Sequence, residues 1–174
     1  MPFNIIYKEE RNRMLFIPKI ITLNKKNHIC APVSGKIVHL QNIPDKAFSN
    51  KLIGDGLAIE VSSNCICAPC QGKISVIAPT KHAFGILTPD GVEILVHIGI
   101  QSLKPNAANY DYQIKVGDLV KVGTPIVTLS EELLKKHNYK IITPIVICNH
   151  YSHPIKAMTT ASSIKAGKTI YTYR

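Results

Sequence analysis

The chain has 174 residues, 45% of them hydrophobic and 18% charged, which is typical of one folded globular domain and not of a disordered protein. Its net charge of +10 comes mainly from the two ends, because residues 1–29 hold six Lys or Arg against two acids and residues 150–174 hold four against none. This distribution, without a stripe of Arg and aromatic residues, argues against a nucleic-acid-binding protein.

The first 27 residues are predicted to form a basic extension ahead of a folded domain at 28–174. They lack the three-part order of a signal peptide, and the longest apolar runs of the chain are only strand-sized. The five cysteines are odd in number and are not spaced as in a small secreted scaffold, which favours reduced thiols. We therefore expect a cytoplasmic protein, whose basic extension leaves open a transient contact with a membrane face.

Alternating β-branched residues and glycine-rich turns predict an all-β chain. The expected strands lie near 35–41, 51–61, 72–78, 80–88, 92–100, 119–129, 144–148 and 169–173. One short helix is expected at 131–137, because Ser130 is a good N-cap and the charges that follow it complement a helix dipole. Residues 104–112 are predicted to form a polar loop.

A short internal repeat organises this pattern. Residues 30–38 (CAPVSGKIV) are echoed by residues 67–75 (CAPCQGKIS), and a second echo links 114–118 (IKVGD) with 164–168 (IKAGK). Each Ala-Pro pair favours an extended entry, and each Gly permits a turn or bulge before a strand. The repeats predict an antiparallel β-sandwich or barrel-sandwich built from glycine-punctuated strands.

Two histidines stand out against the strand pattern. The core face of the strand at 92–100 is expected to carry its even-numbered residues, Val92, Ile94, Val96, Ile98 and Ile100. His97 then lies on the opposite face, beside Gly99. On the strand at 80–88, Thr80, His82 and Phe84 share one face by the same period of two, so Thr80 and His82 should project together.

Spacing alone leaves three interpretations of these histidines open. Zinc binding needs at least three ligands in a fixed layout. Catalysis by an imidazole nucleophile needs a neighbour that holds the ring in one tautomer. A hydrogen-bonded structural role needs neither.

Eight segments in order resemble the glucose-type IIA proteins and domains of the bacterial phosphoenolpyruvate:sugar phosphotransferase system. They are residues 31–37, 43–48, 54–59, 68–72, 80–84, 91–99, 115–118 and 143–146, of which GVEILVHIG at 91–99 is the most specific. The resemblance implies an antiparallel β-sandwich and a phosphotransferase with a phosphohistidine intermediate. Such a carrier takes a phosphoryl group from the phosphocarrier HPr and passes it to a cysteine on the IIB domain of a membrane sugar permease, without a cofactor.

The resemblance also implies roles for single residues. His97 matches the phosphorylated histidine, His82 its partner histidine, and Thr80 the threonine whose hydroxyl supports that partner. The surface that meets partner proteins would include Asp45, Phe48, Phe84 and Gln101.

One departure from the family pattern concerns Gln101 and Ser102, which stand where the family usually has Asp-Thr. The acid normally offers a charge-assisted partner to an arginine on the donor. The alternative function is therefore a regulatory protein-binding module of the same fold, with slow or no phosphotransfer and with regulatory target proteins as partners.

Two metal-based interpretations are weaker. Cys65, Cys67 and Cys70 suggest a zinc site, but Cys67 occupies the same place in the repeat as Cys30, where a small apolar residue suffices. A zinc hydrolase of the lysostaphin type needs His-x-x-x-Asp and His-x-His, and the sequence has neither. We therefore expect no metal site.

Overall fold

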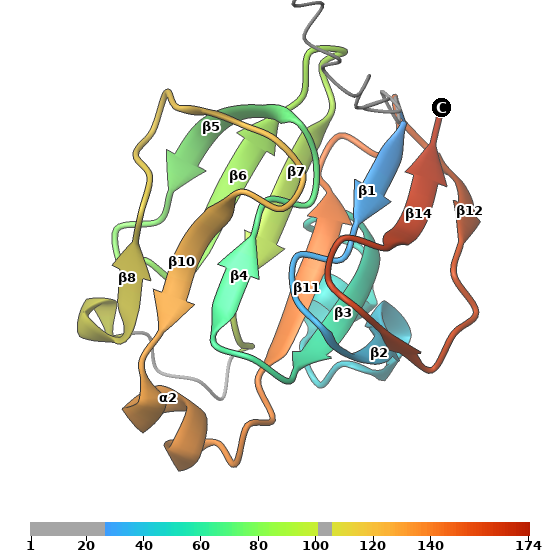
Figure 1. The fold of residues 1–174 in the computed structure, drawn as a ribbon. Coiled ribbons are helices and arrows are strands. Elements are labelled where there is room, and N and C mark those ends of the chain that lie inside the picture. The colour runs from blue at the N-terminus through green and yellow to red at the C-terminus, as the bar shows by residue number, and fades with distance from the viewer. Residues whose placement is uncertain (1–26, 101–105) are drawn as a thin grey trace, which may run out of the picture.

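The computed structural model describes residues 27–100 and 106–174, and the chain forms a sandwich of antiparallel strands (Figure 1). In chain order the strands are β1 (His28–Cys30), β2 (Gly35–His39), β3 (Asp55–Val61), β4 (Cys65–Cys67), β5 (Gly72–Ile77), β6 (Ala83–Leu87), β7 (Glu93–His97), β8 (Tyr110–Tyr112), β9 (Leu119–Val120), β10 (Pro125–Leu129), β11 (Ile142–Ile147), β12 (Ile155–Met158), β13 (Ser163–Ile164) and β14 (Thr169–Tyr173). The helices are α1 (Lys46–Ser49) and α2 (Glu131–Lys136), with 3-10 turns at Leu40–Asn42 and Ala107–Asn109.

Within the described residues, three antiparallel sheets make up the sandwich. The large sheet has the order β13-β2-β3-β11-β7-β6-β5-β9, and two three-stranded sheets have the orders β4-β10-β8 and β1-β14-β12. The main core contains buried side chains from all three, such as Ile94 of β7, Ile66 of β4 and Tyr171 of β14. The predicted all-β sandwich is confirmed, and the core lies between the large sheet and the two small ones. Among the described residues, no helix is both long and apolar enough to cross a membrane.

The first internal repeat is a structural repeat, because its two copies bond reciprocally. The backbone N–H of Cys30 donates to the carbonyl of Pro69 and that of Cys67 donates to the carbonyl of Pro32, both at 2.8 Å. The strands that follow, β2 and β5, then each pair with a late two-residue strand, β13 and β9 respectively. The chain thus contains two related halves whose Ala-Pro loops are hydrogen-bonded to each other.

The second repeat has a different register from the predicted one. Gly167 donates to the carbonyl of Ala31 at 2.9 Å, and the residue that makes the matching bond, to Ala68 at 3.0 Å, is Gly123 and not Gly117. Residues 120–124 are therefore the structural counterpart of 164–168. The sequence echo at 114–118 does not mark the structural counterpart, because a short Gly turn recurs wherever a strand reverses. Gly117 also bonds to the first repeat, but to the carbonyl of Ile74 at 2.9 Å and not to that of Ala68.

The predicted elements are mostly present, with several differences. The strand expected at 119–129 is two strands, β9 and β10, because Gly123 has φ +85° in the turn between them. Part of the expected loop at 104–112 is ordered as a 3-10 turn and β8. The short strands β1, β4, β12 and β13 were not predicted, because two to four residues are too few for a periodic signal. Helix α2 is confirmed, and the hydroxyl of its N-cap Ser130 accepts a bond from Leu133 N at 3.1 Å.

Strand β7 and its flanks show the predicted alternation as far as residue 98, since Val92, Ile94, Val96 and Ile98 are all buried in the main core. Ile100 was expected on the same face but is buried elsewhere, because Gly99 has φ +86° and the strand pattern ends there. The other face of β7 is not simply exposed. A second, smaller apolar cluster covers this outer face of the large sheet and is made of Leu40, Ile43, Phe48, Ala58, Ile100 and Val146. Segment 40–49, with the unpredicted helix α1, supplies half of these side chains. His97 is therefore on the outer face of the sheet, but this segment packs beside it.

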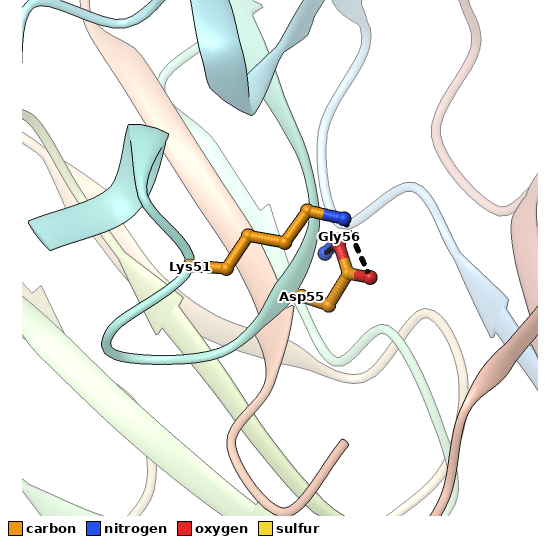
Figure 2. A network of polar contacts seen from close by, with 3 residues as sticks. All are labelled: Lys51, Asp55 and Gly56. Atoms are coloured by element: carbon orange, nitrogen blue, oxygen red, sulfur yellow. Dashed lines mark hydrogen bonds and ion pairs between the residues drawn. The ribbon is translucent and has the colours of Figure 1, made fainter. Parts of the chain in front are cut away.

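A left-handed turn ends α1 and leads into β3. Lys51 has φ +56°, and its N–H donates to the carbonyl of Phe48 at 2.9 Å. Its ammonium group lies 3.0 Å from Oδ2 of Asp55, whose Oδ1 accepts a bond from Gly56 N at 2.8 Å (Figure 2). These contacts fix the start of β3 relative to the helix that carries Phe48.

Candidate active site

His97 is the last residue of β7, where the strand leaves the sheet. Its Nδ1 lies 2.7 Å from the carbonyl oxygen of Gly99, and Gly99 has φ +86°, a conformation that favours glycine. A carbonyl oxygen only accepts, so Nδ1 must carry the proton. The neutral ring then has its unprotonated nitrogen at Nε2.

His82 lies in the turn before β6 and faces His97. Register explains the approach: β6 and β7 pair with Ala83 opposite His97, and Ile98 N donates to the carbonyl of His82 at 2.7 Å. The two imidazole rings are 4.7 Å apart between centroids and nearly perpendicular, at 81°. Nδ1 of His82 in turn lies 2.6 Å from the hydroxyl of Thr80. The expected projection of Thr80 and His82 together is what the structure has.

Helix α1 covers the other side of the His97 ring. Phe48 is only 1% exposed, and its ring meets that of His97 at a centroid distance of 5.1 Å and an angle of 63°. Asp45, 6% exposed, is the N-cap of α1 and accepts a bond from Ala47 N at 2.9 Å. His97 therefore lies between an aromatic ring and a second imidazole.

Burial lowers the pKa of both histidines below the ordinary value. For His97, burial is the largest effect and is opposed by the Gly99 carbonyl and by the negative charge of Asp45. For His82, burial is again the largest effect, and the neighbouring charge of His97 adds to it. Both rings are therefore held toward the neutral form, which leaves a lone pair on Nε2 of His97.

These features fit nucleophilic chemistry at His97. The ring is fixed by one hydrogen bond and one aromatic contact, its free nitrogen is Nε2, and a second imidazole stands next to it as a donor or acceptor. Metal chemistry has less support, because residues 27–100 and 106–174 contain no group of three or more His, Cys, Asp or Glu arranged around a metal position.

The structure brings some of the predicted partner-contact residues to the site and separates others. Phe48 and Asp45 are beside His97, although both are nearly buried. Phe84 is 0% exposed and belongs to the main core, because it pairs with Val96 and shares the core face of the sheet. Its side chain thus offers no contact surface in this structure. Gln101 lies outside the described residues.

Sequence reasoning missed one residue near the site, Tyr112. Its hydroxyl donates to the carbonyl of Lys81, between Thr80 and His82, at 3.0 Å. The only sequence signal was an aromatic residue inside a stretch interpreted as a polar loop.

The cysteines do not converge on one point. The sulfur atoms of Cys65 and Cys67 are 3.9 Å apart on β4, whereas Cys70 is buried, and burial raises its pKa to about 12. A surface hollow of about 560 Å³, lined by residues such as Lys36, Glu60 and Lys140, does not include either site histidine.

Comparison with known proteins gives a consistent family. A family model described as phosphoenolpyruvate-dependent sugar phosphotransferase system, EIIA 1, matches residues 27–152. The chain is 44% identical over 134 residues to the glucose-specific EIIA component of Borreliella burgdorferi, covering 77% of this chain and 69% of that protein. It is 40% identical over 147 residues to the component of the same name from Buchnera aphidicola, covering 84% and 91%.

A solved structure agrees with these relatives. Glucose permease IIA from Mycoplasma capricolum superposes with a TM-score of 0.74 at 32% identity, covering 83% of this chain and 93% of that one.

Proposed function

The chain belongs to the phosphoenolpyruvate-dependent sugar phosphotransferase system EIIA 1 family, and we propose that His97 is the residue that carries its phosphoryl group. Proteins of this family are phosphotransferases with a phosphohistidine intermediate, which exchange phosphoryl groups with HPr and IIB domains during sugar uptake; this chain is one of them. The observation that carries the assignment of His97 is its 2.7 Å bond from Nδ1 to the Gly99 carbonyl.

That bond decides which nitrogen reacts. With Nδ1 protonated, the Nε2 lone pair attacks the phosphorus atom held by the donor, a bond from Nε2 to phosphorus forms, and the bond to the donor's nitrogen breaks. The onward step reverses this at Nε2, with a cysteine sulfur of the IIB domain as the acceptor. Transfer of this kind depends on alignment and charge stabilisation more than on covalent machinery.

His82 would donate a hydrogen bond to the phosphoryl oxygens, and Thr80 would hold His82 in the tautomer that allows this. If the Thr80 hydroxyl donates to Nδ1 of His82, Nε2 of His82 carries the proton and points it at the group on His97. The depressed pKa keeps His82 neutral while His97 is free. A phosphoryl dianion on His97 would raise that pKa again and strengthen the bond.

The wider assignments follow from this role. The folded carrier would span residues 28–174, since β1 at its start pairs with β14 at its end, and residues 1–27 would be an extension. The acceptor belongs to a membrane permease, so the carrier would work in the cytoplasm and meet the membrane face only transiently. Asp45 and Phe48 are nearly buried beside His97, so they would shape the partner contact from beneath the surface, and regulatory target proteins would use the same surface.

Intact-mass measurement tests the proposal. The chain would be incubated with phosphoenolpyruvate, enzyme I and HPr, alongside His97→Ala, His82→Ala and His39→Ala as a control histidine on β2. We expect one acid-labile phosphoryl group on the wild type and on His39→Ala, none on His97→Ala, and a group on His82→Ala that is not passed to a IIB domain. Phosphorylation of His97→Ala would refute the assignment, and no phosphorylation of the wild type by a competent donor would favour the regulatory binding module.

A further inference from the structure

The turn that carries Thr80 and His82 is built from few bonds. Lys81 N donates to the carbonyl of Ala78 at 2.7 Å, and Ala78 N donates to that of Ala83 at 2.9 Å. Lys81 has φ +61°, a left-handed conformation that is unfavourable for a residue with a Cβ atom. Such a conformation persists only where the surroundings hold it.

One residue that holds this turn, Tyr112, comes from the opposite sheet. Tyr112 is the last residue of β8, in the small sheet β4-β10-β8, whereas the turn belongs to the large sheet (Figure 1). Its hydroxyl donates to the Lys81 carbonyl at 3.0 Å, and its ring packs edge-on against the buried Phe84 at 6.3 Å between centroids. Burial raises the pKa of Tyr112, so the hydroxyl keeps its proton and stays a donor.

The Lys81 carbonyl, which accepts the bond from Tyr112, belongs to the peptide unit directly before His82. The carbonyl of Lys81 and the N–H of His82 are parts of one planar peptide unit. The next peptide unit is held by the bond from Ile98 N to the His82 carbonyl, at 2.7 Å. Both units that flank His82 are therefore fixed, one by the main chain of β7 and the other by the Tyr112 side chain.

We propose that Tyr112 is a positioning residue for phosphoryl transfer, which holds the Lys81–His82 peptide unit and thereby aims the His82 imidazole at His97. This inference rests on the function proposed above. Without the hydroxyl, the left-handed turn can relax and rotate the peptide unit, and the 2.6 Å contact of Thr80 with His82 is then made in only part of the population. His97 keeps its own bond to Gly99, so the onward transfer that uses His82 should suffer more than uptake of the group.

The test compares Tyr112→Phe with Tyr173→Phe. Each variant loses a tyrosine hydroxyl and keeps its ring. The Tyr173 hydroxyl lies 3.3 Å and 3.0 Å from the two carboxylate oxygens of Asp90 and takes no part in the site. The measurements are the rate of transfer from the phosphorylated protein to a IIB domain at saturating acceptor, the KM for phospho-HPr, the melting temperature, and the imidazole ¹⁵N shifts of His82.

We expect Tyr112→Phe to slow the transfer rate by about 10-fold to 100-fold, as small misplacements of reacting groups do, with little change in KM. Its His82 ¹⁵N shifts should move toward those of a mixture of tautomers. Tyr173→Phe should transfer like the wild type, even if it melts lower. Wild-type transfer and wild-type His82 shifts in Tyr112→Phe would overturn the inference, while leaving His97 as the carrier. The carrier role fails separately, if the wild type accepts no phosphoryl group or His97→Ala still does.

Discussion

Replacing Phe48 by Ala tests whether helix α1 sets the protonation of His97. Phe48 is 1% exposed and is the largest side chain of the outer cluster, so truncation leaves a cavity. Buried Phe→Ala changes cost about 3–5 kcal/mol of the free energy of unfolding. The four-residue helix α1 lies at the surface and can settle partly into the gap, so we expect a loss near the lower end, about 3 kcal/mol.

The same change should alter the chemistry of His97. Burial is the largest cause of its lowered pKa, and the Phe48 ring, 5.1 Å away, supplies part of that burial. Water that enters beside the ring would raise the pKa of His97 toward the ordinary value of about 6.5. At pH 6 a larger fraction of His97 would then be protonated at Nε2, and uptake of the phosphoryl group would slow, because a protonated nitrogen has no lone pair.

Urea unfolding gives the stability, and an NMR titration of the His97 imidazole gives the pKa. Ile66→Ala is the control, since Ile66 is equally buried but lies in the main core on β4. It should cost about 2–5 kcal/mol and leave the pKa of His97 unchanged. A folded Phe48→Ala protein with an unchanged His97 pKa would refute the reasoning, as would a rise of the same size in Ile66→Ala.

Two further predictions concern stability. Lys51 has a left-handed backbone conformation, so the free energy of unfolding in urea should be about 1 kcal/mol higher for Lys51→Gly than for Lys51→Ala. Both variants lack the exposed ion pair to Asp55, so that contact does not affect the comparison. Equal free energies would show that the turn is unstrained. Because the pKa values of His82 and His97 are lowered on folding, the unfolded chain binds more protons below about pH 6.5, and stability should fall as the pH drops from 7.5 to 5. Melting temperatures across that range should fall less for the double variant His82→Gln, His97→Gln, and an identical slope would contradict the prediction.

Local pattern alone was enough for several features of this protein. The alternation correctly predicted that Val92, Ile94, Val96 and Ile98 face the main core, because successive side chains of a strand point to opposite faces wherever the strand lies. It was wrong for Ile100, which follows the positive-φ Gly99 and packs in the outer cluster. The N-cap at Ser130 and the charges after it correctly predicted α2, since capping acts within one turn. The first repeat correctly indicated two related halves, as its reciprocal bonds show.

Tertiary structure decided how these pieces meet. His82 and Phe84 were expected on one face by period two, but His82 precedes the strand, and the turn carries it to His97 while Phe84 enters the core. Nothing within a short window encodes the register of β6 on β7, which brings Ala83 opposite His97.

The same reason explains Tyr112, whose hydrogen bond to the turn that carries His82 joins residues 31 positions apart across two sheets. Sequence periodicity determines the face on which a side chain lies, because that depends only on neighbouring residues. The partner that the side chain meets depends on long-range pairing and packing, and that belongs to the fold as a whole.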